Sequence, residues 1–227
     1  MKKRHALSTR IWHWINAAAL IVLFMSGLNI SNAHRYLYWG DYGFDPADAW
    51  TSVIRFPGWA TIPGYYDLAA ARDWHSLAAW AFGVGLLFIW IAMLLNGHFR
   101  RDIATARKDW APASLVSEVF AHLQGKFERQ LSKYNTLQKI TYGIVYGIFL
   151  PMMVLTGLSI SPGFEPAAPW LVEILGGRQS ARSLHFIFAW ALFAFFVVHI
   201  AMVVLSGPWM QIKDMITGGK AQERSHA

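Results

Sequence analysis

The chain has 227 residues, 55% of them hydrophobic, and a formal charge of +7 at pH 7. This composition is too apolar for an ordinary soluble domain, and the length suits one small membrane bundle. The chain contains no cysteine, which excludes disulfides, cysteine-ligated iron–sulfur clusters and haem attached through C-x-x-C-H. A redox cofactor would therefore be held by histidine or methionine. Basic residues usually mark the cytoplasmic side of a membrane protein, so the positive charge does not indicate a nucleic-acid-binding protein.

Four apolar stretches are long enough to span a bilayer, which takes about 20 residues. We predict spans at about residues 11–30, 73–96, 137–160 and 182–205. The first has a spanning length rather than the shorter length of a cleaved signal peptide. The fold class predicted for the single domain, residues 1–227, is therefore an all-α membrane protein built as a four-transmembrane-helix bundle.

Two long loops separate these spans. The loop at 32–72 is aromatic and rich in Pro and Gly, and the loop at 97–136 is basic. Because Trp and Tyr favour the headgroup level, the first loop is predicted to fold as an interfacial cap. The third span carries Gly143 and Gly147 one turn apart, which favours close approach of another helix or of a flat cofactor. The tail from Gly207 is polar, and we expect it to be frayed.

Two pairs of segments resemble each other along the chain. The second and fourth spans open with the pattern A-R-x-x-H-x-x-x-A-W, at 71–80 and 181–190. The first and third spans end with MSGLNIS at 25–31 and LTGLSIS at 155–161. This similarity indicates two related helical hairpins in the same orientation.

The motif R-x-x-H occurs three times in the chain, as Arg10 with His13, Arg72 with His75, and Arg182 with His185. Residues three apart share a helix face, so each Arg lies one turn nearer to the membrane surface than its His. Haem propionates point toward water, and an Arg in this place could pair with them through charge-assisted hydrogen bonds. The alternative is that these arginines only snorkel at helix ends, which explains the repeated offset less easily.

The fourth span holds two histidines, His185 and His199, 14 residues apart. At 100° per residue both imidazoles face the same way, about 21 Å apart along the helix axis. Ionisable residues inside a membrane span indicate a functional site. One helix would thus offer a nitrogen ligand near each leaflet, as two haems stacked across the membrane require.

The distribution of Lys and Arg predicts the orientation of the chain. Most of the 20 lie on the side that holds both termini, which the positive-inside rule places in the cytoplasm. The direction of each span then puts His75 and His185 near the outer leaflet, and His13 and His199 near the inner one. We predict that each pair ligates one metal. The other five histidines are interpreted as surface residues: His5, His34, His98, His122 and His226.

These features resemble the di-haem cytochrome b membrane subunits of hydrogenases, formate dehydrogenases and thiosulfate reductases, the bacterial cytochrome b561-like group. The resemblance covers all four spans and includes the 14-residue spacing on the last one. Segments WGDYGFDPA, FPGWATIPGYYDLA and GGRQSARSLHF are similar to the thiosulfate-reductase-type branch. That branch implies a periplasmic molybdopterin oxidoreductase, with or without an iron–sulfur subunit, as partner, and a bacterial inner membrane location. It also implies two haem b groups, with His75/His185 as outer and His13/His199 as inner ligands.

The family resemblance further implies a quinone site beside the inner haem. The segment KYNTLQK at 133–139 is similar to the polar entry of the third span in formate dehydrogenase gamma subunits. Its Asn135 and Gln138 share one face at the cytoplasmic end and could hydrogen-bond a quinone carbonyl. The alternative is a helix N-cap at Asn135 with an exposed Gln138, and the sequence does not separate the two.

The sequence thus favours an electron-transfer subunit rather than a stand-alone catalyst. It would link a periplasmic redox partner to the quinone pool through two bis-His haems. A self-contained superoxide:quinone oxidoreductase is the alternative, and a basic surface leading to the outer haem would favour it. A haem-free transporter or scaffold would leave the four histidines within the spans unexplained.

Overall fold

The computed structural model describes residues 7–95, 97, 111–112, 116–117, 120, 136–205 and 207–219. Four apolar units in it are long enough to cross a membrane, which confirms the predicted fold class. They are α1 (Leu7–Ala33), α2 (Leu68–Leu95), α4 (Thr136–Ile144) continued by α5 (Leu150–Ser159), and α7 (Arg178–Leu205). Most of the loop predicted at 97–136 lies outside the described residues.

Three of the helices begin several residues before the predicted spans. The side chain of Asp67 accepts the backbone N–H of Ala70 at 3.0 Å, so it caps α2 in the polar stretch ahead of the apolar run. Helix α7 begins directly after Gly176 and Gly177, which have φ angles of +78° and +104°. Hydropathy detects where a helix meets lipid, whereas these caps decide where its hydrogen bonds begin.

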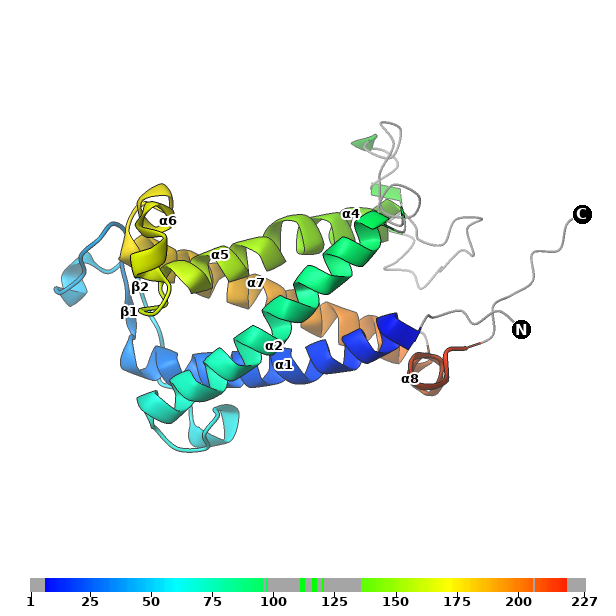
Figure 1. Cartoon of the computed structure of the whole chain (residues 1–227). Coiled ribbons are helices and arrows are strands. Elements are labelled where there is room, and N and C mark those ends of the chain that lie inside the picture. The colour runs from blue at the N-terminus through cyan, green and yellow to red at the C-terminus, as the bar shows by residue number, and fades with distance from the viewer. Residues whose placement is uncertain are drawn as a thin grey trace, which may run out of the picture.

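The bundle consists of two helical hairpins, α1 with α2 and α5 with α7, which run side by side in Figure 1. This arrangement agrees with the repeat seen in the sequence. Between the hairpins, Phe24 of α1 stacks on Phe193 of α7 with ring centroids 4.3 Å apart. Within the first hairpin, a Cβ atom on Gly85 would overlap the Trp12 ring, so glycine lets this indole lie directly against α2.

The third spanning unit contains a π-helical turn, Val145–Phe149, between α4 and α5. Pro151 follows this turn at the start of α5. Proline has no amide hydrogen and its ring collides with the carbonyl one turn earlier, so a regular α-helix could not pass through it unchanged. Apart from its own helix backbone and its chain neighbours, no described atom lies within 4 Å of a Cβ built on Gly143 or Gly147. The predicted close helix approach at these glycines is therefore wrong for the described residues, while the flat-cofactor alternative stays a prediction.

One end of the bundle carries a folded cap, defined as residues 34–67 and 160–177 (Figure 1). It contains a two-stranded antiparallel sheet in which Tyr36 pairs with Ser52 and Leu37 with Thr51. Strands of two residues leave no periodic pattern in a sequence, so only the cap itself was predictable. Its elements are β1 (Tyr36–Leu37), η1 (Pro46–Asp48), β2 (Thr51–Ser52), η2 (Gly58–Ala60), η6 (Glu165–Ala167) and α6 (Pro169–Ile174).

Buried polar side chains on the spanning helices hold the cap in place. The amide of Asn29 on α1 is fully buried and donates to the Tyr65 carbonyl at 2.8 Å. On α7, the buried Ser183 hydroxyl accepts a hydrogen bond from the Trp50 indole at 2.9 Å. Because a buried polar group without a partner is costly, these bonds fix the loop over the helix ends.

The start of α7 makes a second connection to the cap at Gly40. The Gly40 N–H donates to the Ser180 hydroxyl at 2.7 Å, and its carbonyl accepts the backbone N–H groups of Gln179 and Ser180. A Cβ on Gly177 would overlap the Gly40 carbonyl, so the close approach depends on glycine. The first N–H groups of α7 are thereby satisfied by the cap rather than by solvent.

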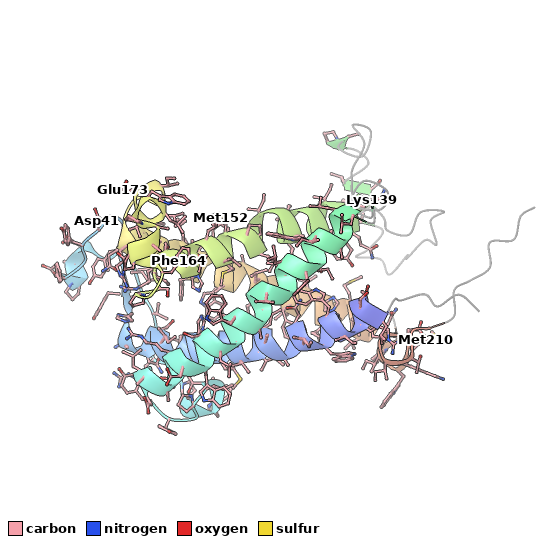
Figure 2. The ribbon with its side chains drawn as sticks, in the orientation of Figure 1. Asp41, Lys139, Met152, Phe164, Glu173 and Met210 are labelled. Carbon is pink, nitrogen blue, oxygen red and sulfur yellow. The ribbon has the colours of Figure 1, made fainter. Side chains whose placement is uncertain are left out.

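The opposite end of the bundle carries the last described helix, α8 (Pro208–Thr217), near the start of α1 (Figure 1). Lys139 at the start of the third unit lies at this same end, whereas Asp41 and Glu173 lie at the cap (Figure 2). The expected frayed tail is wrong for 208–217. Pro208 is pre-organised for the first helical turn, and Gly218 at φ +99° closes the helix by donating to the Asp214 carbonyl.

Candidate functional site

The structure brings the four predicted histidines together in two pairs. His75 on α2 and His185 on α7 form the pair nearer to the cap, which we call the cap-side pair. Their ring centroids lie 6.2 Å apart, with an interplanar angle of 61°. His13 on α1 and His199 on α7 form the terminus-side pair, with centroids 6.5 Å apart at 58°. The pairing by depth expected from the sequence is therefore the pairing found in space.

Both separations fit two imidazoles on opposite faces of one metal. With metal–nitrogen bonds of about 2 Å, and ring centres about 1 Å beyond the nitrogens, the two centres lie about 6 Å apart. Among the described residues, no group of three or more His, Cys, Asp or Glu side chains is placed to hold a bare metal ion. Two-histidine sites suit a metal whose other ligands come from a macrocycle, as in a bis-histidine haem. Ligation by these histidines stays a prediction.

The cap-side histidines each meet a buried hydroxyl from the neighbouring helix of their own hairpin. The Nδ1 atom of His75 lies 3.0 Å from the Ser26 hydroxyl oxygen. The Nδ1 atom of His185 lies 2.9 Å from the Thr156 hydroxyl oxygen. Both hydroxyl residues are 0% exposed. Neither residue was predicted from the sequence as part of a site, although both sit at the same place in the repeated MSGLNIS and LTGLSIS segments.

The terminus-side histidines lie among aromatic rings. The His13 ring contacts Trp14 edge-on with centroids 5.1 Å apart, and the His199 ring stacks on Phe195 at 6.2 Å. Both histidines are half-buried. These two aromatic neighbours come from the same helices as the histidines that they contact.

The three predicted arginines lie in different surroundings. Arg182 is half-buried and donates to the Gln179 side chain at 2.6 Å, while Arg72 is exposed and lies 3.5 Å from the Nε2 atom of His34. Arg10 hydrogen-bonds the Ile216 carbonyl of α8 and lines a shallow apolar groove between α1 and α8. Each Arg is nearer to its end of the bundle than the histidine it precedes. Pairing with propionates stays a prediction for all three.

His34 is less exposed than the surface position that the sequence suggested. It lies half-buried just beyond α1, beside Arg72. Burial, together with the positive charges of Arg182 and Arg72, lowers the pKa of His34 below its usual value of 6.5. The neutral ring accepts a hydrogen bond from Arg72, so this end of the bundle gathers one neutral imidazole and two guanidinium groups above the cap-side pair.

The predicted quinone-binding residues are only partly described. Gln138 is half-buried near the start of α4, at the end of the bundle that holds the terminus-side pair, and Asn135 lies outside the described residues. Neither the quinone interpretation nor the N-cap alternative is tested by this placement.

The chain is similar over most of its length to known proteins. The family model described as prokaryotic cytochrome b561 matches residues 4–218, and the chain therefore belongs to this family. It is 30% identical over 198 residues to a protein of Azospira oryzae described as a protein-methionine-sulfoxide reductase subunit, YedZ1, covering 86% of this chain and 87% of the relative. It is 24% identical over 226 residues to a protein of Cupriavidus necator described as a B-type cytochrome subunit of a Ni/Fe-hydrogenase, covering 92% and 82%.

The family expected from the sequence is thus confirmed. The chain is a multi-pass membrane cytochrome of the electron-transport type, and haem b is the cofactor that this family implies. The finer resemblance to the thiosulfate-reductase-type branch stays a prediction. So do the number of haems, the orientation with both termini in the cytoplasm, and the bacterial inner membrane as its location.

Proposed function

We propose that this protein is a di-haem b-type cytochrome that connects a redox partner subunit to the quinone pool. The observation that carries the proposal is the presence of two histidine pairs at opposite ends of one bundle, with ring centroids 6.2 and 6.5 Å apart. Each separation suits one bis-imidazole haem. In this proposal His75 and His185 hold the cap-side haem, and His13 and His199 hold the terminus-side haem.

The chain would supply binding, orientation and charge to both cofactors. A haem with two axial histidines provides reversible one-electron transfer and leaves no open position for substrate. Helix α7 contributes one histidine to each pair, so a single rigid element sets the spacing between the two levels. Arg72 and Arg182 place positive charge at the cap end, and Arg10 does so at the other, where negative propionates would need it.

The partner subunit is proposed to bind at the cap. The cap carries several exposed aromatic side chains, with Tyr42, Phe44 and Trp59 at 78%, 86% and 85% exposure. Large aromatic residues contribute strongly to protein interfaces. The relatives in Azospira oryzae and Cupriavidus necator are described as subunits of oxidoreductases, which supports a redox partner here. A periplasmic molybdopterin oxidoreductase is the partner implied by the thiosulfate-reductase-type resemblance.

The quinone is proposed to bind at the opposite end. Gln138, half-buried near the start of α4, would hydrogen-bond a quinone carbonyl together with Asn135. Replacing Gln138 with Leu should slow quinol oxidation by the purified protein while both haems are kept. An unchanged rate would favour the N-cap interpretation of this segment.

A pyridine haemochrome assay on the protein purified from its native membrane tests the cofactor content directly. Two haems per chain are expected, and one or none would contradict the proposal. Mass spectrometry of the same preparation, solubilised in mild detergent, should identify a second oxidoreductase subunit. A chain that consistently purifies alone would remove the support for a partner.

The self-contained superoxide:quinone oxidoreductase is less well supported. Superoxide is attracted by a strongly basic surface near the electron-accepting site, but the loops at 32–72 and 161–181 contain no lysine, and Arg178 in the second loop forms an ion pair with Glu165. Rapid, salt-sensitive consumption of superoxide by the isolated chain in quinone-containing liposomes would favour this alternative over a subunit.

A further inference from the structure

The hydroxyl groups beside the cap-side pair are arranged to accept hydrogen bonds rather than to donate them. The Ser26 hydroxyl donates its single hydrogen to the Val22 carbonyl at 2.6 Å, one turn earlier on α1. The Thr156 hydroxyl does the same to the Met152 carbonyl at 2.6 Å on α5. Each oxygen therefore faces its histidine with a lone pair, and the hydrogen between them belongs to the imidazole.

This arrangement fixes the tautomer of both rings. A neutral imidazole has one N–H group and one bare nitrogen. The backbone of Leu23 is a further hydrogen-bond partner of His75, and that of Met153 is one of His185. With the proton on Nδ1 donated to Ser26 in one ring and to Thr156 in the other, Nε2 is the nitrogen that keeps a free lone pair. Only a nitrogen in that state can ligate a metal.

We propose that Ser26 and Thr156 are positioning residues that hold His75 and His185 in the tautomer needed for metal ligation and increase electron donation from their Nε2 atoms. The inference rests on the proposed role of these histidines as haem ligands. A hydrogen bond from Nδ1–H to an acceptor raises the basicity of the ligating nitrogen. A more basic ligand favours the oxidised metal, so both hydroxyls should lower the potential of the cap-side haem.

The glycines that follow the two hydroxyl residues contact the histidine rings in the same way in both hairpins. A Cβ on Gly27 would lie 3.6 Å from the Cε1 atom of His75, and one on Gly157 would lie 3.3 Å from Cε1 of His185. In each segment a hydroxyl residue is followed by a residue with no side chain, so the ring edge can rest against the neighbouring helix. The repeated segments therefore share a hydroxyl residue and a glycine that both contact the histidine ring, in addition to their similar helix ends.

The experiment replaces each hydroxyl by a residue without one. Ser26→Ala and Thr156→Val should keep the fold, because the helix carbonyls that the hydroxyls bond remain in their backbone helical bonds, and the change removes only the hydroxyl acceptor beside each imidazole. Redox titration should show an upward shift of one haem component, with the other unchanged. A tenfold change in the preference for oxidised over reduced haem corresponds to about 59 mV for a one-electron couple. Low-temperature EPR of the oxidised protein should show altered g values for the same component.

Matched variants separate this role from a structural one. Ser26→Thr and Thr156→Ser keep a hydroxyl and should restore the wild-type potential and g values. Ser31→Ala is the control, because Ser31 makes the same bond to a carbonyl one turn earlier, that of Gly27 at 2.9 Å, on the same helix. Its potential and g values should match the wild type.

Each outcome bears on the inference. If Ser26→Ala loses the cap-side haem instead of shifting its potential, restoration by Ser26→Thr still supports positioning. Unchanged potentials and g values in both hydroxyl-free variants would overturn it, as would an equal shift in Ser31→Ala. A wild-type protein without two haems would contradict the proposed function instead, so the two failures are distinguishable.

Discussion

The cap-side and terminus-side histidine pairs have similar ring separations but are built differently by the repeated chain. His75 and His185 occupy equivalent positions in the two hairpins, and each has a hydroxyl from the equivalent place on the other helix of its hairpin, α1 or α5. His13 and His199 are not equivalent to each other. The same register places Gly143 at the position of His13 and Ile89 at the position of His199.

The two pairs therefore relate differently to the internal repeat. The cap-side pair lies between the two hairpins. Each hairpin carries the R-x-x-H motif and a hydroxyl residue followed by glycine, so each contributes the same set of groups to this pair. The terminus-side pair takes one histidine from the first helix of one hairpin and one from the second helix of the other. Its neighbours, such as Trp14 and Phe195, are therefore unrelated in the repeat.

The largest effect is expected when one histidine of either pair is removed at a time. His75→Ala and His185→Ala should each reduce the haem content from two per chain to one, with loss of the same spectral component. His13→Ala and His199→Ala should remove the other component. Haem is counted by pyridine haemochrome and resolved by redox titration.

His34→Ala serves as the control for these variants, because His34 contacts Arg72 and lies outside both pairs. It should retain two haems. Loss of the same component in His75→Ala and His13→Ala would mean that the pairing by depth does not describe the cofactors.

A smaller effect is expected from the glycine beside the second cap-side histidine. A Cβ on Gly157 would lie 3.3 Å from His185, tighter than the 3.6 Å between Gly27 and His75. Overpacking of this kind costs about 1–3 kcal/mol, so Gly157→Ala should weaken haem retention on heating more than Gly27→Ala does. Gly83→Ala, where a Cβ meets no described atom within 4 Å, should behave as the wild type. Equal retention in all three would indicate that the rings move freely to accommodate a methyl group.

Much of this comparison was predictable from the sequence. Hydropathy located the four spans, and the 14-residue spacing with the R-x-x-H motif located both histidine pairs, because helix periodicity converts residue number into depth and direction. The hydroxyl partners were not recognised, since contact between Ser26 and His75 depends on how α1 and α2 are rotated against each other. The cap bonds from Gly40 to the start of α7 join distant parts of the chain, which no local pattern records.

The arginine at the cap end should have a moderate electrostatic effect. Arg182→Gln removes a positive charge from the half-buried group near the cap-side pair, which disfavours the reduced state of the haem held there. A partly exposed charge interaction is worth up to about 1 kcal/mol, equivalent to about 40 mV in a one-electron couple. Redox titration should therefore show a lowered potential for one component.

Arg55→Gln removes an exposed charge from the cap and should leave both potentials unchanged. If Arg182→Gln also leaves them unchanged, the snorkelling interpretation of the R-x-x-H arginines is favoured over propionate pairing.

The smallest expected effect concerns pH. Because the folded-state pKa of His34 is below 6.5, the unfolded chain takes up this proton first as the pH falls. The contribution of the neutral ring to stability is complete above about pH 6.5 and is lost below it. His34→Gln, which can still accept a hydrogen bond from Arg72, should reduce the loss of thermal stability between pH 7.5 and 5.5. An identical pH dependence in both proteins would show that other groups control it.

The bonds from the cap to α7 impose an order on the assembly of the protein. Gly40 and Trp50 follow the first helix, whereas their partners Ser180 and Ser183 begin the last one. During synthesis the N-terminal hairpin emerges first, so these partners do not exist while the first three spanning units are being inserted. We therefore expect the cap to close over its end of the bundle last, which leaves His75 accessible from that end until the final helix arrives with His185.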